Sequence, residues 1–283
     1  MTNKFFQIFA ALYLLIACTN GSSKSKDLPQ KIVSLTVASD EILYALLEEK
    51  GELNRIAALS SFSNDSKYSN IAEKSKKIKN KVGSQIESIL QLKPDLIIAA
   101  KFTSPNLLTK LSQLKLNHLK LESFSNLGDI KKNINLIANA TGTHSEATKL
   151  IESLETIKPI KFQKSPHVLN YNPSGYIMGQ DTIITDLLKK MGIENVVKES
   201  GWPKITPEKI STLNPDYIIA SGNVGDLDIV HKQLSAAPGW SSIPAVKYKK
   251  IILVPEKDLS SASHFIVNAY SLIKSSIISD MKK

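Results

Sequence analysis

Residues 87–99 read E-S-I-L-Q-L-K-P-D-L-I-I-A, and residues 208–220 read E-K-I-S-T-L-N-P-D-Y-I-I-A. Eight letters agree, and each matching pair lies 121 positions apart. Both copies predict a short helix that buries an Ile and a Leu, a Pro that cannot continue the helix, and an apolar run with the length of a buried parallel strand. A helix–turn–strand unit that recurs at this distance predicts two similar lobes.

Strand and helix patterns alternate on both sides of the repeated phrase, without hairpin signals. This alternation predicts α/β lobes with parallel sheets, and ligands of such sheets bind beyond the carboxyl ends of the strands. We expect an N-terminal lobe over 29–126, a linker over 127–158 and a C-terminal lobe over 159–283. The loops that follow the strands, such as 60–64 and 101–105, then become the walls of a ligand cleft between the lobes.

The linker carries a helical pattern with two apolar stripes. Thr141, Gly142 and Thr143 interrupt the pattern between the stripes, so local rules predict two helices that separate at Gly142. A continuous helix of this length would instead form a rod of about 45 Å, long enough to connect two lobes.

The N-terminus predicts export. Residues 1–17 form a signal peptide with Lys4 as its positive region and an apolar run that is short for a membrane span. The run ends in L-I-A-C at Cys18, which resembles the bacterial lipoprotein signal and implies a diacylglycerol on the Cys18 sulfur. Cys18 is the only cysteine, so no intrachain disulfide can form. The alternative is a plain signal peptide, and in either case 18–28 is predicted to be a flexible spacer.

The chain has an ordinary globular composition, with 42% hydrophobic and 22% charged residues in 283, and a formal net charge of +10. One lysine cluster comprises Lys74, Lys76, Lys77, Lys79 and Lys81. No aromatic residues interleave these lysines, as a single-strand nucleic-acid platform would require, so we predict a solvated face and no nucleic-acid partner. Attraction to anionic lipid headgroups or to an anionic ligand is the alternative.

Four stretches resemble one known protein family. They are I-V-S-L-T-V-A-S-D-E-I-L-Y-A-L from Ile32, V-G-S-Q-I-E-S-I-L-Q-L-K-P-D-L-I-I-A from Val82, W-P-K-I-T-P-E-K-I-S-T-L-N-P-D-Y-I-I-A from Trp202 and A-P-G-W-S-S-I-P-A-V-K from Ala237. In this order they resemble the substrate-binding proteins of bacterial ABC importers for vitamin B12, ferric siderophores and haem. The resemblance spans nearly the whole mature chain.

The resemblance implies two Rossmann-like lobes that are joined by a single long helix, which would run through Gly142 and permit only small lobe motions. It implies a monomer that is lipid-anchored to a bacterial membrane and faces the periplasm or the cell exterior. The protein would catalyse nothing and hold no cofactor of its own. It would deliver a metal chelate (cobalamin, a ferric siderophore or haem) to an ABC permease and its ATPase.

Two glutamates stand where the family has one surface glutamate per lobe for docking onto arginines of the permease. They are Glu87 and Glu208, the first letters of the two repeated phrases. Charge-assisted hydrogen bonds from both lobes would let the permease sense the relative position of the lobes. The alternative for either residue alone is a helix N-terminal glutamate that the helix dipole favours.

The resemblance also suggests ligand contacts. Trp202 matches an aromatic wall position of the vitamin B12 binder, whereas Asn80 and Lys81 stand where that binder has its first-lobe tryptophan. The other candidate cleft residues are Ser39, Phe62, Phe102, Tyr176 and His264. Core packing is an equal alternative for each aromatic, and an isolated histidine is more often structural. We predict no catalytic residue and no protein metal site.

Two other functional classes stay open at this stage. An exported hydrolase is disfavoured because the chain has no G-x-S-x-G, H-E-x-x-H or G-x-G-x-x-G motif and its histidines are scattered. A receptor for free metal ions would need a cluster of His and carboxylate ligands between the lobes.

Overall fold

The computed structural model describes residues 28–172, 176–204 and 206–282. The predicted signal peptide, Cys18 and all but the last residue of the spacer lie outside these ranges. Among the described helices, none is both long and apolar enough to cross a membrane.

The N-terminal lobe contains a five-stranded parallel sheet in the order β3-β2-β1-β4-β5. Its strands are β1 (Ile32–Ser34), β2 (Ile56–Ser60), β3 (Lys81–Val82), β4 (Leu96–Ala100) and β5 (His118–Leu121). Its helical segments are α1 (Val37–Lys50), η1 (Leu53–Arg55), α2 (Ala72–Ser75), α3 (Ile86–Gln91) and α4 (Pro105–Gln113). The crossover helices lie against the sheet, as parallel pairing requires.

The C-terminal lobe repeats this design with a four-stranded parallel sheet in the order β7-β6-β8-β9. Its strands are β6 (His167–Tyr171), β7 (Glu194–Asn195), β8 (Tyr217–Ser221) and β9 (Ile251–Val254). Its helical segments are α7 (Ile183–Met191), α8 (Pro207–Leu213), η2 (Val224–Asp226), α9 (Leu227–Ala236), α10 (Pro244–Lys247), α11 (Glu256–Leu259) and α12 (Ile266–Met281). The prediction of two parallel α/β lobes is confirmed.

The repeated phrase forms the same unit in both lobes: α3 leads into β4, and α8 leads into β8. The aspartate of the phrase links the start of this strand to a neighbouring strand through hydrogen bonds. The Asp95 carboxylate accepts hydrogen bonds from the backbone N–H groups of Gln30 and Lys31 at 2.6 and 2.9 Å, just before β1. In the second copy, Asp216 accepts one from the N–H of His167 at 2.8 Å, at the start of β6. The aspartate is therefore part of the scaffold.

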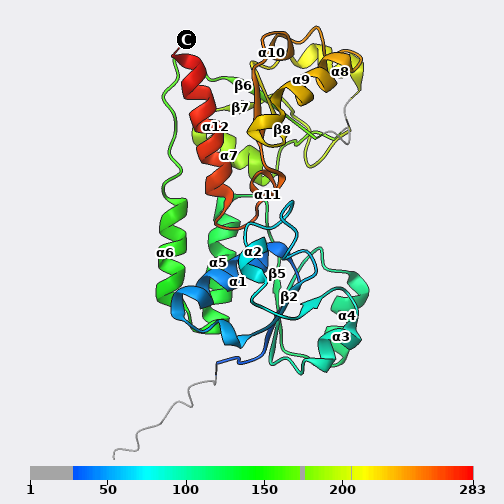
Figure 1. The fold of residues 1–283 in the computed structure, drawn as a ribbon, viewed down its shortest axis with the longest axis vertical. Helices are drawn as coiled ribbons and strands as arrows, with labels where there is room; N and C mark the ends of the chain where they lie inside the picture. The colour runs from blue at the N-terminus through cyan, green and yellow to red at the C-terminus, as the bar shows by residue number, and fades with distance from the viewer. Residues whose placement is uncertain (1–27, 173–175, 205, 283) are drawn as a thin grey trace, which may run out of the picture.

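The linker contains two helices, α5 (Leu127–Thr141) and α6 (His144–Leu154), so the prediction of one continuous helix through Gly142 is wrong. Gly142 adopts a left-handed φ of 71° and its N–H donates to the Ala138 carbonyl at 2.7 Å, which ends α5. Figure 1 shows α5 and α6 running side by side, and the two helices pack against each other. The local rule at Gly142 thus outweighs the family pattern.

One apolar core extends through both lobes. It includes Ile42 on α1, Ile134 on α5, Leu187 on α7 and Ile273 on α12, all fully buried. Helix α5 packs on α1 in the first lobe and on α7 in the second. The lobes are therefore joined by packed helices along one side and stand apart on the other, which gives the molecule the open shape in Figure 1.

Candidate functional site

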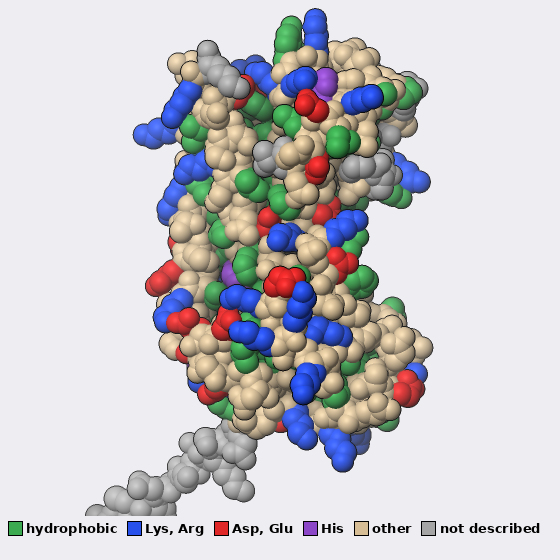
Figure 2. All heavy atoms as spheres, viewed as in Figure 1, with side chains coloured by type: hydrophobic (Ala, Val, Ile, Leu, Met, Phe, Trp, Pro, Cys, Tyr) green, Lys and Arg blue, Asp and Glu red, His purple; other side chains and the backbone are tan. Residues whose placement is uncertain are grey.

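A cleft of about 950 Å³ lies at the carboxyl ends of the N-terminal lobe's strands. The start of α1 and the loops after β2, β3 and β4 line it, and the segment 260–262 between α11 and α12 adds a wall from the C-terminal part of the chain. Figure 2 shows the molecule hollowed between the two lobes on the side where they stand apart. Parallel sheets bind ligands at this edge because their loops converge there.

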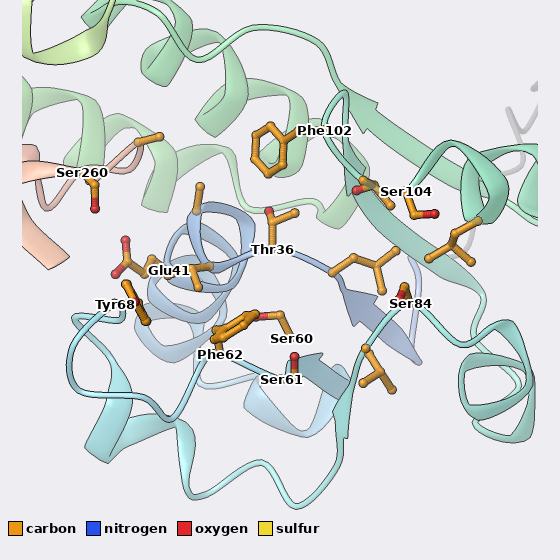
Figure 3. Close-up of a pocket in the computed structure, with 18 of the residues that line it drawn as sticks. Thr36, Glu41, Ser60, Ser61, Phe62, Tyr68, Ser84, Phe102, Ser104 and Ser260 are labelled. Atoms are coloured by element: carbon orange, nitrogen blue, oxygen red, sulfur yellow. The ribbon is translucent and has the colours of Figure 1, made fainter. Parts of the chain in front are cut away.

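Aromatic side chains stand at opposite sides of the cleft. Phe62 and Phe102 both line it, and their side chains are 57% and 61% exposed, which is unusual for phenylalanine. Phe62 meets Tyr68 edge-on with ring centroids 6.0 Å apart, and Phe102 packs on Phe124 at 5.0 Å. In Figure 3, Phe62 and Phe102 lie on either side of Thr36. Two supported, water-exposed rings are suited to hold a large apolar or flat ligand between them.

Hydroxyl groups occur at several points of the cleft lining, whose exposed surface is mostly apolar. Those labelled in Figure 3 belong to Thr36, Ser60, Ser61, Ser84, Ser104 and Ser260. Helix α1 begins after the two residues that follow β1, and its first residues, Val37 and Ala38, also line the cleft. A hydroxyl can both donate and accept a hydrogen bond, so this surface suits uncharged polar groups of either kind.

Two buried carboxyls follow each other on α1, and the second of them, Glu41, lines the cleft. Asp40 is fully buried and accepts hydrogen bonds from the backbone N–H of Ser60 at 3.2 Å and from the Ser60 hydroxyl. Glu41, which lines the cleft, is 1% exposed and accepts from the Asn70 N–H at 2.7 Å and from the Ser263 hydroxyl at 2.5 Å. Burial raises the pKa of Asp40 to about 7 and the pKa of Glu41 to about 7.

Of the six candidate ligand residues, the structure brings Phe62 and Phe102 together in the cleft. Ser39 is fully buried below it, where its hydroxyl lies 2.7 Å from those of Ser34 and Thr36. This network fixes the turn between β1 and α1 and leaves Ser39 no surface for a ligand.

The other three candidates do not line this cleft either. His264 is 9% exposed and stacks on Phe265 with ring centroids 4.2 Å apart, and burial lowers its pKa to about 4, so it stays neutral. Tyr176 and Trp202 lie in the C-terminal lobe, with 37% and 50% of their surface exposed. The backbone pairs Tyr176 with Lys204, two residues after Trp202, in an antiparallel bridge.

Several lining residues are absent from the sequence prediction. Glu41 follows Asp40 within a helical pattern, where nothing separates it from an ordinary surface carboxylate. Lys257 and the segment 260–262 come from the C-terminal part of the chain, and only the tertiary fold brings them to the N-terminal lobe. Ser60 and Ser61 could have been found, because the loop that they begin is expected at a strand end.

The two predicted docking residues occupy equivalent helices. Glu87 is exposed in the first turn of α3, and within the described ranges it forms no ion pair. Glu208 follows Pro207 at the start of α8, and its side chain lies outside the described part of the structure. Figure 1 shows α3 and α8 on the side where the lobes stand apart, one on each lobe.

The described residues contain no group of three or more His, Cys, Asp or Glu side chains that could hold a metal ion. The cleft itself has one carboxyl, Glu41, whose oxygens already accept two hydrogen bonds. Its chemistry is thus suited to enclosing a molecule rather than coordinating a bare cation.

Comparisons with known proteins agree with this architecture. The family model described as periplasmic binding protein matches residues 32–257. An uncharacterized ABC transporter substrate-binding lipoprotein of Bacillus subtilis is 26% identical over 270 residues, which cover 90% of this chain and 82% of that protein. A vitamin B12-binding protein of Yersinia pseudotuberculosis is 23% identical over 233 residues, covering 78% and 79%.

A solved structure shares the fold. The crystal structure of a possible iron-binding (periplasmic solute-binding) protein from Staphylococcus epidermidis superposes with a TM-score of 0.74 at 22% identity. The match covers 88% of this chain and 98% of that one. The two chains therefore share their overall fold.

Proposed function

This chain belongs to the periplasmic binding protein family, and we propose that it is the substrate-binding component of an ABC importer for cobalamin, a ferric siderophore or haem. It binds the chelate in its cleft and delivers it to a membrane permease that works with an ATPase. The family consists of binding proteins, and the proposed role needs no catalysis by this chain.

The cleft between the aromatic rings carries this proposal. Its volume of about 950 Å³ is at the upper end of the usual range for small-molecule sites, which is about 300–1,000 Å³. Phe62 and Phe102 expose apolar surface to water, and a ligand that covers this surface would gain binding free energy by removing it from water. A bulky chelate that hides its metal behind an organic shell meets these requirements, whereas a free ion does not.

The relatives support the partners and the location. The Bacillus subtilis relative is described as a lipoprotein of an ABC transporter, and the Yersinia relative as a vitamin B12-binding protein. We extend this to a lipid anchor at Cys18 outside the cytoplasm and to permease docking through Glu87 and Glu208. The mature protein acts as a monomer that presents one carboxylate from each lobe.

Calorimetric titration of the mature protein tests the proposal. The ligands are cyanocobalamin, haem, a ferric trihydroxamate and a ferric triscatecholate, with free Fe³⁺ and Zn²⁺ as the probes for a metal-ion receptor. We expect at least one chelate to bind with 1:1 stoichiometry and neither free ion to do so. If every chelate fails to bind, the proposal is overturned, and tight binding of a free ion would favour the metal-ion receptor instead.

A further inference from the structure

Resting on the function proposed above, we propose that the cleft selects electroneutral chelates with carbonyl and amide groups at their periphery and discriminates against chelates that carry carboxylates or other anionic groups. This selectivity depends on which charged side chains line the cleft and on which charged side chains already form hydrogen bonds or ion pairs within the protein.

Arginine is the usual partner of ligand carboxylates and phosphates, but among the described residues no arginine lines this cleft. The whole sequence contains one arginine, Arg55, and it is 3% exposed. Its guanidinium donates to the Glu52 carboxylate at 2.5 Å and to the carbonyls of Pro29 and Thr141 at 2.7 and 3.0 Å. The Arg55 side chain therefore stabilises the fold, and it lies outside the cleft lining.

The N-terminus of α1 faces the cleft, and a free helix N-terminus would attract an anion. Here the same helix carries Asp40 in its first turn and Glu41 directly after it, and both side chains are buried. Any negative charge on these carboxyls opposes the helix dipole at short range. Glu41 itself lines the cleft, so wherever its carboxyl is ionised a ligand anion would be placed next to a negative charge.

Among the described lining residues, Lys257 is the one that carries a positive charge. The large positive charge of the chain is elsewhere: for example, the ammonium group of Lys81 donates to the carbonyls of Ser75 and Ile78, and Lys76 pairs with Glu73. The lining therefore holds one lysine and one glutamate whose pKa burial raises to about 7, so its net charge near neutral pH lies between zero and +1. A ligand with two or three negative charges would lose its water without gaining matched partners.

The polar groups that remain in the lining are uncharged. The hydroxyls of Ser61, Ser84 and Ser104 and the amide of Gln85 can donate to carbonyl oxygens and accept from amide N–H groups. Cobalamin, with its peripheral amides, and neutral ferric trihydroxamates fit this inventory. Haem with two propionates and ferric complexes of citrate or catecholates do not.

Matched ligand pairs test the selectivity at constant shape. We would compare cyanocobalamin with its monocarboxylate, in which one peripheral amide has been hydrolysed, and haem with haem dimethyl ester. A neutral ferric trihydroxamate and an anionic ferric triscatecholate form a third, looser pair. In every pair that binds, we expect the neutral member to bind at least about tenfold more tightly, with little dependence on salt concentration.

A variant supplies the positive control. Ser84 is exposed in the lining, and Ser84→Arg adds the missing guanidinium, while Ser84→Gln adds similar bulk without charge. We expect Ser84→Arg to improve binding of the anionic member relative to the neutral one, and Ser84→Gln to leave the ratio unchanged.

The outcomes separate the two proposals. Equal or tighter binding of the anionic members by the wild-type protein overturns the charge selectivity and leaves the proposed function standing. Binding that weakens steeply with salt, as recognition through opposite charges would, also overturns the selectivity alone. If no chelate of either kind binds, the proposed function falls, and the charge selectivity falls with it.

Discussion

The carboxyl of Glu41 accepts a hydrogen bond of 2.5 Å from the hydroxyl of Ser263, which lies 222 positions further along the chain. A second bond parallels it, because the Asn70 side-chain amide donates to the Lys257 carbonyl at 3.1 Å. These bonds tie α1 and the loop before α2 to the α11–α12 segment. The far wall of the cleft is thus held by the N-terminal lobe.

The burial of Glu41 makes stability depend on pH. The pKa of Glu41 is about 7 in the folded protein and close to its ordinary 4.5 when unfolded, so between these values the folded state holds a proton that the unfolded state has lost. The free energy of unfolding therefore falls as the pH rises from about 4.5 to about 7, by at most about 3 kcal/mol for this group. Urea denaturation across this range measures the slope.

The variant Glu41→Gln isolates the contribution. Glutamine can still accept the bonds from Asn70 and Ser263, but it does not titrate. Asp40, which has the same sign of slope, and His264, whose lowered pKa gives the opposite slope, are present in both proteins, so most of their contribution cancels in the difference; the coupling between Asp40 and Glu41 is the part that does not. We expect the stability of Glu41→Gln relative to wild type to rise with pH through this window. Parallel pH profiles would contradict the assignment.

The repeated phrase predicts the parallel sheets because its apolar letters and its Pro are local signals. The role of its aspartate is not a local signal, since Asp95 accepts its bond from Lys31 and Asp216 from His167, which lie 64 and 49 positions away. Gly142 ends a helix as its local context predicts. The family pattern is the weaker guide at that position.

Part of the cleft lining could be predicted from the sequence. Phe62 and Phe102 follow β2 and β4, and exposed residues after buried strands are recognisable by position. Ser39 shares the same region, but helical geometry turns its hydroxyl toward Ser34. Glu41 escapes prediction because its role depends on Ser263, and no periodicity links residues so far apart.

Removing either exposed ring of the cleft is expected to weaken ligand binding without unfolding the protein. Phe62→Ala and Phe102→Ala should each lower chelate affinity by about tenfold, because each deletes aromatic surface that the ligand would cover. Both rings are more than half exposed, so the melting temperature should change little. Tyr248→Ala, which removes a 65% exposed ring outside the cleft lining, is the control for calorimetric titration. Unchanged affinity in both phenylalanine variants would remove these rings from the site.

The docking proposal predicts a separation of transport from binding. Glu87→Ala combined with Glu208→Ala should abolish uptake of the chelate by cells that carry the cognate permease, while the purified variant keeps its affinity. The reason is that both carboxylates are needed to fix the two lobes on the permease. Glu73→Ala combined with Glu194→Ala, again one change per lobe, is the matched control. Normal uptake by the Glu87 and Glu208 variant would disprove the assignment.

The anchor proposal predicts a change of compartment. Cys18→Ser removes the sulfur that would carry the lipid, so the protein should move from the membrane fraction to the soluble exported fraction. Immunoblots of fractionated cells measure this, and the ligand affinity of the purified variant serves as the control. Retention of Cys18→Ser in membranes would mean that something other than an acyl chain holds the protein.

Two left-handed glycines give a matched test of the linker. Gly142 has φ 71° and Gly51 has φ 77°, so an alanine at either position costs about 1 kcal/mol of backbone strain. At Gly51 nothing lies within 4 Å of the new Cβ, whereas at Gly142 it would meet the Leu28 side chain at 2.7 Å. Gly142→Ala should therefore destabilise more than Gly51→Ala in urea denaturation, and adding Leu28→Ala should remove the excess. If the additional loss of stability persists without the Leu28 side chain, the contact with Leu28 is not its cause. If Gly142→Ala and Gly51→Ala lose the same stability, the Leu28 side chain moves aside without an energetic cost.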